Sequence, residues 1–224
     1  MRIYMPNPIT LDIFADPVCP WCLIGKAELD RALESRPDHP FDIRWQPFRL
    51  DPQMPPAGMP YVEYMKMKFG GEKGILDAMR PVMEASERLG LWINPSLIER
   101  MPNTMDAHRL LFWAGLEGVQ TRVMSGLMRA FWREGQNISN PDVLVAIAES
   151  AGMKGELVRR LLTSGQDRDQ VAERERHARE RGISSVPTFI IADTHVVSGA
   201  QPAALWQNVI DELAGQDDGT ASPA

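Results

Sequence analysis

Side chains that ligate metals are scarce in this sequence, which has two cysteines and four histidines in 224 residues. A structural zinc site takes four ligands, often as two spaced pairs, and the sequence has no second cysteine pair. The histidines show no ligand spacing among themselves; they are His39, His108, His177 and His195. We therefore expect no metal site and no tightly bound cofactor.

Positive charge and long apolar runs are also in short supply. Lysine and arginine total 24 against 30 aspartates and glutamates, which leaves a net charge of −6. This balance argues against a nucleic-acid or membrane partner, and no apolar run approaches the roughly 20 residues of a membrane helix. The first residues, MRIYMPNPITLDIF, lack the features of a secretory signal. We expect a cytoplasmic protein.

What the sequence does contain is a hydrophobic fraction of 44% and clear strand and helix patterns. The first three segments predict a strand, a helix and a strand, at residues 8–14, 19–35 and 41–48. Their short connections suit one βαβ unit. Two strands joined by a turn and a last helix are predicted near the other end, at residues 187–193, 195–199 and 201–213.

The middle of the chain has a different character. From about residue 60 to residue 181 nearly every segment has helical spacing, and glycines stand near several helix ends. Helices inserted between the two halves of one small sheet would cover it and create a binding cleft. The predicted fold class is therefore α/β, with βαβ and ββα halves and a large all-helical insertion.

Both cysteines lie in the stretch DPVCPWCLIGK, after the first predicted strand. Cys19 is expected at a helix N-terminus, where unpaired N–H groups and the helix dipole favour a thiolate. Cys22, one turn later and more buried, could then resolve a mixed disulfide formed on Cys19. Pro20 and Trp21 would set the helix geometry and shield the pair. A structural disulfide is the weaker interpretation, because so small a loop removes little chain entropy.

The stretch GISSVPTFII supplies a second feature of a redox site. Pro187, preceded by Val186, stands just before a predicted strand and has no N–H to donate to a strand ladder. A cis proline beside the cysteines would leave a backbone edge free for a substrate. The alternative is an ordinary proline at the start of a strand, and the cysteine motif favours the cis interpretation.

The chain resembles the DsbA family of thiol-disulfide oxidoreductases, in particular its cytoplasmic FrnE-like branch. The resemblance extends to about Leu213 and rests on motifs in the same order: DPVCPWCLIGK, WQPFRLDP, NTMDAHRLLFWA, FWREGQNISNPDVLVAIAESAGM, GISSVPTFII and VSGAQP. It implies a thioredoxin-like domain from residues 1–59 and 182–214 and a helical insertion domain at 60–181. Residues 215–224 are small and polar, which predicts a disordered tail.

By the same resemblance, Cys19 is the nucleophile, Cys22 the resolving thiol, and Pro187 the cis proline with Val186 before it. The implied substrates are disulfide-containing proteins or small molecules, with glutathione or another thiol as a co-substrate and a homodimer as the assembly. One departure matters: periplasmic relatives carry a histidine between the cysteines, whereas this chain has Pro-Trp. We therefore expect a weaker oxidant than DsbA.

His108 has two interpretations. It lies on a predicted helix with apolar neighbours three and four residues away, so it could bind substrate beneath the helical insertion or be a hydrogen-bonded interior residue. Arg109, beside it, is expected to be structural.

Two other functions remain open on the sequence alone. One is a glutathione-dependent isomerase or transferase, similar to 2-hydroxychromene-2-carboxylate isomerases and kappa-class glutathione transferases. Such enzymes typically have a serine in place of Cys19, and this chain retains both cysteines. The other is a non-catalytic, chaperone-like binding protein, which would leave the paired thiols without a purpose.

Overall fold

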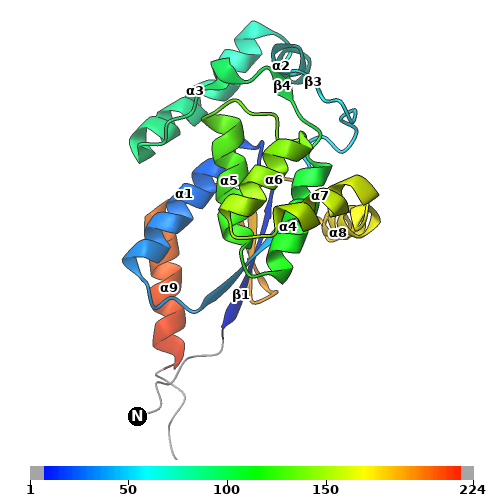
Figure 1. The fold of residues 1–224 in the computed structure, drawn as a ribbon. Helices are drawn as coiled ribbons and strands as arrows, with labels where there is room; N and C mark the ends of the chain where they lie inside the picture. Colours follow the sequence, from blue (N-terminus) through cyan, green and yellow to red (C-terminus); the bar gives the residue numbers. More distant parts are fainter. Residues whose placement is uncertain (1–7, 218–224) are drawn as a thin grey trace, which may run out of the picture.

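The structure, a computed structural model, describes residues 8–217 and consists of a small sheet with many helices around it (Figure 1). Its strands are β1 (Ile9–Ala15), β2 (Phe41–Pro47), β3 (Met59–Pro60), β4 (Arg100–Met101), β5 (Thr188–Ile191) and β6 (His195–Ser198). Its α-helices are α1 (Pro20–Ser35), α2 (Tyr61–Phe69), α3 (Glu72–Leu89), α4 (Met105–Leu116), α5 (Gln120–Trp132), α6 (Pro141–Ser150), α7 (Gly155–Ser164), α8 (Arg168–Glu180) and α9 (Ala203–Asp217), and a short 3₁₀ helix spans Pro95–Leu97.

The main sheet has the strand order β2-β1-β5-β6. Strand β1 pairs parallel with β2 and antiparallel with β5, and β5 pairs antiparallel with β6. Leu11 and Ile13 are fully buried because β1 has a strand on each side and helices packed over the sheet. The predicted βαβ and ββα halves are confirmed, and they meet along the β1–β5 pairing.

Helix α1 begins directly after the first cysteine. Cys19 is its N-cap residue and Pro20 its first helical residue, where the missing N–H of proline costs nothing. Helix α1 is buried on more than one side, since Cys22 and Ile24, which are both buried, point in nearly opposite directions from its axis. Helix α9 packs beside α1, as Figure 1 shows at the lower left. The cysteine motif thus starts a helix that is held on several sides.

The inserted helices are joined to the sheet by polar contacts as well as apolar packing. The Gln120 side chain at the start of α5 accepts a hydrogen bond from the Trp45 N–H (2.8 Å) and donates one to the Trp45 carbonyl oxygen (2.9 Å). The Trp45 indole N–H also donates to Thr121 Oγ1 (3.0 Å). The two bonds from Gln120 satisfy the backbone N–H and carbonyl oxygen of Trp45, which β2 presents at the edge of the sheet.

Two details of the sequence prediction are wrong. The insertion is not all helical, because β3 and β4 form a two-residue antiparallel pair that Arg100 supports by donating to the carbonyl oxygens of Ala57 and Gly58. Helix α9 continues to Asp217, so residues 215–217 are helical rather than part of a disordered tail. The rest of that predicted tail, residues 218–224, lies outside the described residues.

No helix among residues 8–217 is long and apolar enough to cross a membrane.

Candidate functional site

The two cysteines lie at the junction of β1 and α1, in one hydrogen-bonded turn. The Cys19 N–H donates to the Asp16 carbonyl oxygen (2.9 Å), and the Cys22 N–H donates to the Cys19 carbonyl oxygen (3.1 Å). Both are free thiols. Cys19 is 4% exposed and Cys22 1%, so Cys19 is the more accessible thiol by a small margin, and both are buried. Trp21 between them is 37% exposed and is the part of the motif that solvent reaches.

Cys22 is strongly biased towards the protonated thiol. Burial raises its pKa well above the usual value, and a hydrogen bond with Cys19 and the charge interaction with Cys19 raise it further. A backbone hydrogen bond from Asp16 lowers the Cys22 pKa, and the negative charge of Asp16 raises it. Near neutral pH, Cys22 is therefore a neutral thiol.

Val186 and Pro187 lie against the cysteine turn, and the peptide bond between them is cis, as expected from the sequence. The Cys19 thiol donates to the Val186 carbonyl oxygen at 3.8 Å. Pro187 also packs on α1, because a Cβ added at Gly25 would lie 3.0 Å from the Pro187 Cγ. Residues 167 positions apart in the sequence thus meet at one sulfur atom.

The helical insertion holds the loop before the cysteines. The Trp132 indole N–H, from the end of α5, donates to the Pro17 carbonyl oxygen (3.1 Å), and both groups are buried. Trp132 itself is fully enclosed and packs edge-on against Phe131 with ring centroids 5.0 Å apart. The position of the cysteine turn therefore depends on the insertion as well as on the sheet.

Asp16 is a buried carboxylate beside Cys22 with one oxygen left unsatisfied. Its Oδ2 accepts from the Leu50 N–H (2.8 Å) and from Thr104 Oγ1 (3.3 Å). Its Oδ1 lies 3.6 Å from His108 Nε2, and within residues 8–217 neither of these two buried atoms has a hydrogen-bond partner. Buried polar atoms without a partner are rare in folded proteins, and each invites a functional explanation.

His108 does not occupy the place that a substrate-binding role requires. It is buried on α4 and borders a cavity of only about 10 Å³. The interior interpretation of His108 fits this position, with Asp16 as its neighbour. Arg109 is structural, as predicted: it is fully buried and donates to the carbonyl oxygens of Leu161 and Gln166.

Asp16 was not among the site residues predicted from the sequence. Its signal was present in the motif DPVCPWC, where a carboxylate directly follows an apolar strand that is predicted to be buried. Such a charge needs partners or a task. Among the described residues, no cluster of three or more histidine, cysteine or acidic side chains could hold a metal ion.

Comparisons with known proteins agree with this geometry. Residues 10–211 match the family described as the DSBA-like thioredoxin domain. A Bacillus subtilis relative, the uncharacterized protein YwbO, is 28% identical over 209 residues, which cover 91% of this chain and 96% of YwbO. Among solved structures, the probable DsbA oxidoreductase SCO1869 from Streptomyces coelicolor has a TM-score of 0.81 at 26% identity, covering 96% of this chain and 92% of that one.

Two more distant structures share the fold. A 2-hydroxychromene-2-carboxylate isomerase has a TM-score of 0.69 at 17% identity, covering 95% of this chain and all of that one. The cytosolic disulfide reductase DsbM from Pseudomonas aeruginosa, solved with GSH, has a TM-score of 0.66 at 18% identity, covering 92% and 99%. At these identities the likeness concerns the fold alone.

Proposed function

Because the chain belongs to the DSBA-like thioredoxin domain family, we propose that it is a thiol-disulfide oxidoreductase that works through Cys19 and Cys22. The observation that carries the proposal is the meeting of the Cys19 sulfur, the start of α1 and the Val186–Pro187 segment at one point. A structural pair of thiols has no need of that arrangement.

In the first step, the Cys19 thiolate attacks a substrate disulfide. A Cys19–substrate disulfide forms, the substrate S–S bond breaks, and the first substrate sulfur leaves as a thiolate that takes a proton from water. The N–H groups at the start of α1 and the helix dipole favour negative charge on Cys19 in this step.

In the second step, Cys22 loses its proton to water and attacks the Cys19 sulfur. The Cys19–Cys22 disulfide forms, the bond to the substrate breaks, and the second substrate sulfur leaves as a thiolate. Two electrons have then passed from the dithiol to the substrate. The raised pKa of Cys22 separates the steps, because a neutral Cys22 does not compete with Cys19 for the incoming disulfide.

We further propose that the protein is cytoplasmic and reduces or isomerises disulfides, with glutathione or another thiol restoring the dithiol. Two findings support this. The Pro-Trp dipeptide provides no histidine to stabilise the Cys19 thiolate, which makes the pair a weaker oxidant. DsbM, which shares the fold, is described as a cytosolic disulfide reductase and was solved with GSH.

Trapping the mixed disulfide tests the proposal. Cys22→Ser should accumulate a covalent adduct between Cys19 and a substrate protein or peptide, visible by mass spectrometry without reductant and reversed by dithiothreitol. The matched variant Cys19→Ser should form none. Absence of the adduct with every disulfide tried, oxidised glutathione included, would contradict the function.

Free-thiol titration of the unmodified protein separates the alternatives. Loss of both thiols on exposure to oxidised glutathione, with no lasting adduct, supports the oxidoreductase. A persistent glutathione adduct on one thiol favours a glutathione-dependent isomerase or transferase.

A further inference from the structure

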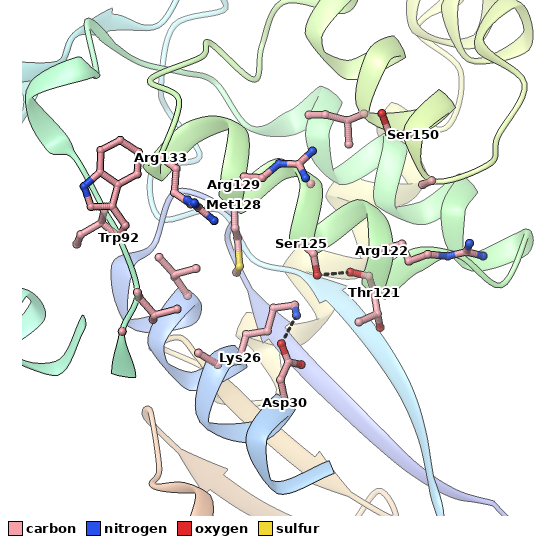
Figure 2. Close-up of a pocket in the computed structure, with 18 residues that line it drawn as sticks. Lys26, Asp30, Trp92, Thr121, Arg122, Ser125, Met128, Arg129, Arg133 and Ser150 are labelled. Atoms are coloured by element: carbon pink, nitrogen blue, oxygen red, sulfur yellow. Dashed lines mark hydrogen bonds and ion pairs between the residues drawn. The ribbon is translucent and has the colours of Figure 1, made fainter. Parts of the chain in front are cut away.

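A groove of about 550 Å³ lies next to the cysteine helix and is not part of the chemistry described above (Figure 2). One wall is formed by α1 and the other by α5, and the segment that follows α3 closes one side. Ile147 and Ala151, at the end of α6, complete the lining. Gly126 allows this close packing, since a Cβ there would lie 2.8 Å from the Ile147 Cγ2.

On α1 the lining of the groove begins at Leu23, one helical turn after Cys19, and Cys19 itself does not line it. Leu23, Lys26 and Asp30 line it from α1. Leu23 stands four residues after Cys19 and Lys26 seven, so they continue the helix face that Cys19 begins. With a rise of about 1.5 Å per residue, Lys26 lies about 10 Å along the helix axis from Cys19. An extended peptide covers this distance in about three residues.

The groove is basic although the protein is acidic. Four cations and one carboxylate line it, Lys26, Arg122, Arg129, Arg133 and Asp30, while the whole chain has a net charge of −6. Lys26 is only 7% exposed and pairs with Asp30 at 2.5 Å. Figure 2 shows Lys26 extending from α1 and Arg133 from the end of α5, with Met128 between them.

The cations are only partly neutralised. Arg129 pairs with Glu134 at 3.3 Å, and both side chains are exposed. Arg133 has no carboxylate partner among residues 8–217 and lies instead over the Trp92 ring, 5.9 Å from its centre. Trp92 is itself an exposed aromatic residue at the rim. The groove therefore has uncommitted positive charge beside a large apolar surface.

The floor is apolar, with Leu23, Leu91, Ile93 and Met128 among the lining residues. A ligand that suits this groove has acidic groups on an otherwise mixed or apolar chain. Nucleic acid does not suit it, because a partly apolar groove on an acidic protein offers no continuous phosphate track. A peptide that is joined to Cys19 through a mixed disulfide suits the groove.

We propose that the groove binds an acidic segment of the polypeptide substrate, with a glutamate or aspartate about three residues from the substrate cysteine. This proposal rests on the proposed function, because Cys19 must form the mixed disulfide that brings the segment to the groove. Arg133, which has no carboxylate partner among residues 8–217, contacts the acidic side chain, and Trp92 covers an apolar neighbour. The groove thereby selects among substrates that share the same disulfide chemistry.

Peptide disulfides of matched sequence test the proposal. Symmetric disulfides of nine-residue peptides with a central cysteine would carry glutamate, glutamine or lysine three residues from it, on either side. Cys22→Ser protein is mixed with each, quenched in acid, and the rate of mixed-disulfide formation read by mass. At low salt, we expect the peptide with glutamate on one side of its cysteine to react about threefold faster than the glutamine peptide for each ion pair that it forms with the groove.

The net charge of the protein makes the test sharper. Acting alone, a charge of −6 would slow the acidic peptide and speed the basic one. A faster reaction of the glutamate peptide must therefore come from a local basic site. About 0.5 M salt should bring the ratio of the glutamate rate to the glutamine rate close to one, since the Debye length is then only a few ångströms.

Substitutions in the Cys22→Ser background complete the design. Arg133→Gln, and Arg129→Gln with Arg133→Gln, should lower the glutamate-to-glutamine ratio towards one. Arg160→Gln, an exposed arginine on α7 away from the groove, should leave the ratio unchanged. Equal rates for the three peptides, or the fastest rate for lysine, would overturn the groove proposal alone. A lack of mixed disulfide with every peptide would instead overturn the proposed function.

Discussion

Replacing Asp16 with asparagine separates the two effects that this residue has on the site. The change keeps the size of the side chain and one acceptor oxygen for the Leu50 N–H and Thr104 hydroxyl. The unsatisfied Oδ1 becomes an amide NH₂ that faces His108 Nε2, now 3.6 Å away. In the His108 tautomer that carries its proton on Nδ1, Nε2 accepts a hydrogen bond from this NH₂ group.

Two results follow from this geometry. An unsatisfied buried polar group costs about 1–3 kcal/mol, so satisfying both atoms should stabilise the reduced protein by about 1 kcal/mol, or about 2–4 °C in Tm for a chain of this size. The negative charge that helps to raise the Cys22 pKa is also lost. The Cys22 pKa should therefore fall, and its thiolate should form at lower pH.

Urea unfolding under reducing conditions gives the first result, and thiolate absorbance near 240 nm during a pH titration of Cys19→Ser protein gives the second. His108→Gln is the matched control, because it also provides a donor to Oδ1 while leaving the Asp16 charge in place. It should stabilise the protein without lowering the Cys22 pKa. A destabilised Asp16→Asn protein with an unchanged Cys22 titration would refute this account of the pair.

Three further outcomes are expected. Gly25→Ala should slow substrate turnover and destabilise the protein, because the added Cβ would lie 3.0 Å from the Pro187 Cγ. In the control Gly215→Ala, in α9, the added Cβ would have nothing within 4 Å, so this change should be neutral or stabilising. Urea unfolding and turnover rates of both variants check these outcomes. Glu175→Gln should cost about 3 kcal/mol in urea unfolding, since this buried carboxylate holds the loop after β2 through a 2.6 Å ion pair; an unchanged midpoint would contradict it. Because the pKa of Cys22 is raised in the folded protein, the unfolded state loses this proton first, and the reduced protein should lose stability as pH rises above about 8.5; Cys22→Ala should remove that part of the pH dependence.

The features predicted from sequence are those with a local cause. The strand before Cys19 has alternating apolar residues, Pro20 suits only the first turn of a helix, and the segment around Pro187 precedes an apolar run. Each pattern determines the secondary structure of its own segment, and the right-handed βαβ rule then indicates how the first two strands and the helix between them pack together. The two halves of the sheet and the meeting of the two motifs followed from these patterns.

The features that were missed depend on how the insertion packs against the sheet. Asp16 and His108 are 92 positions apart, and nothing near either residue indicates the other. The groove between α1 and α5 arises in the same way. The β3–β4 pair has only two residues in each strand, and Arg100 of β4 donates to the Ala57 carbonyl oxygen, 43 positions away in the sequence. Helical periodicity alone does not determine such side-to-side contacts.

The strand order has a consequence for synthesis on the ribosome. Leu11 of β1 pairs with Ile191 of β5, so the central strand lacks one of its neighbours until most of the chain has been made. At about 5–20 residues per second, the roughly 180 residues between these positions take about 10–35 s to synthesise. Throughout that interval Cys19 and Cys22 lack the cover of Val186 and Pro187. The nascent chain is therefore most open to oxidation, and to thiol–disulfide exchange with other disulfides, before its own redox site exists.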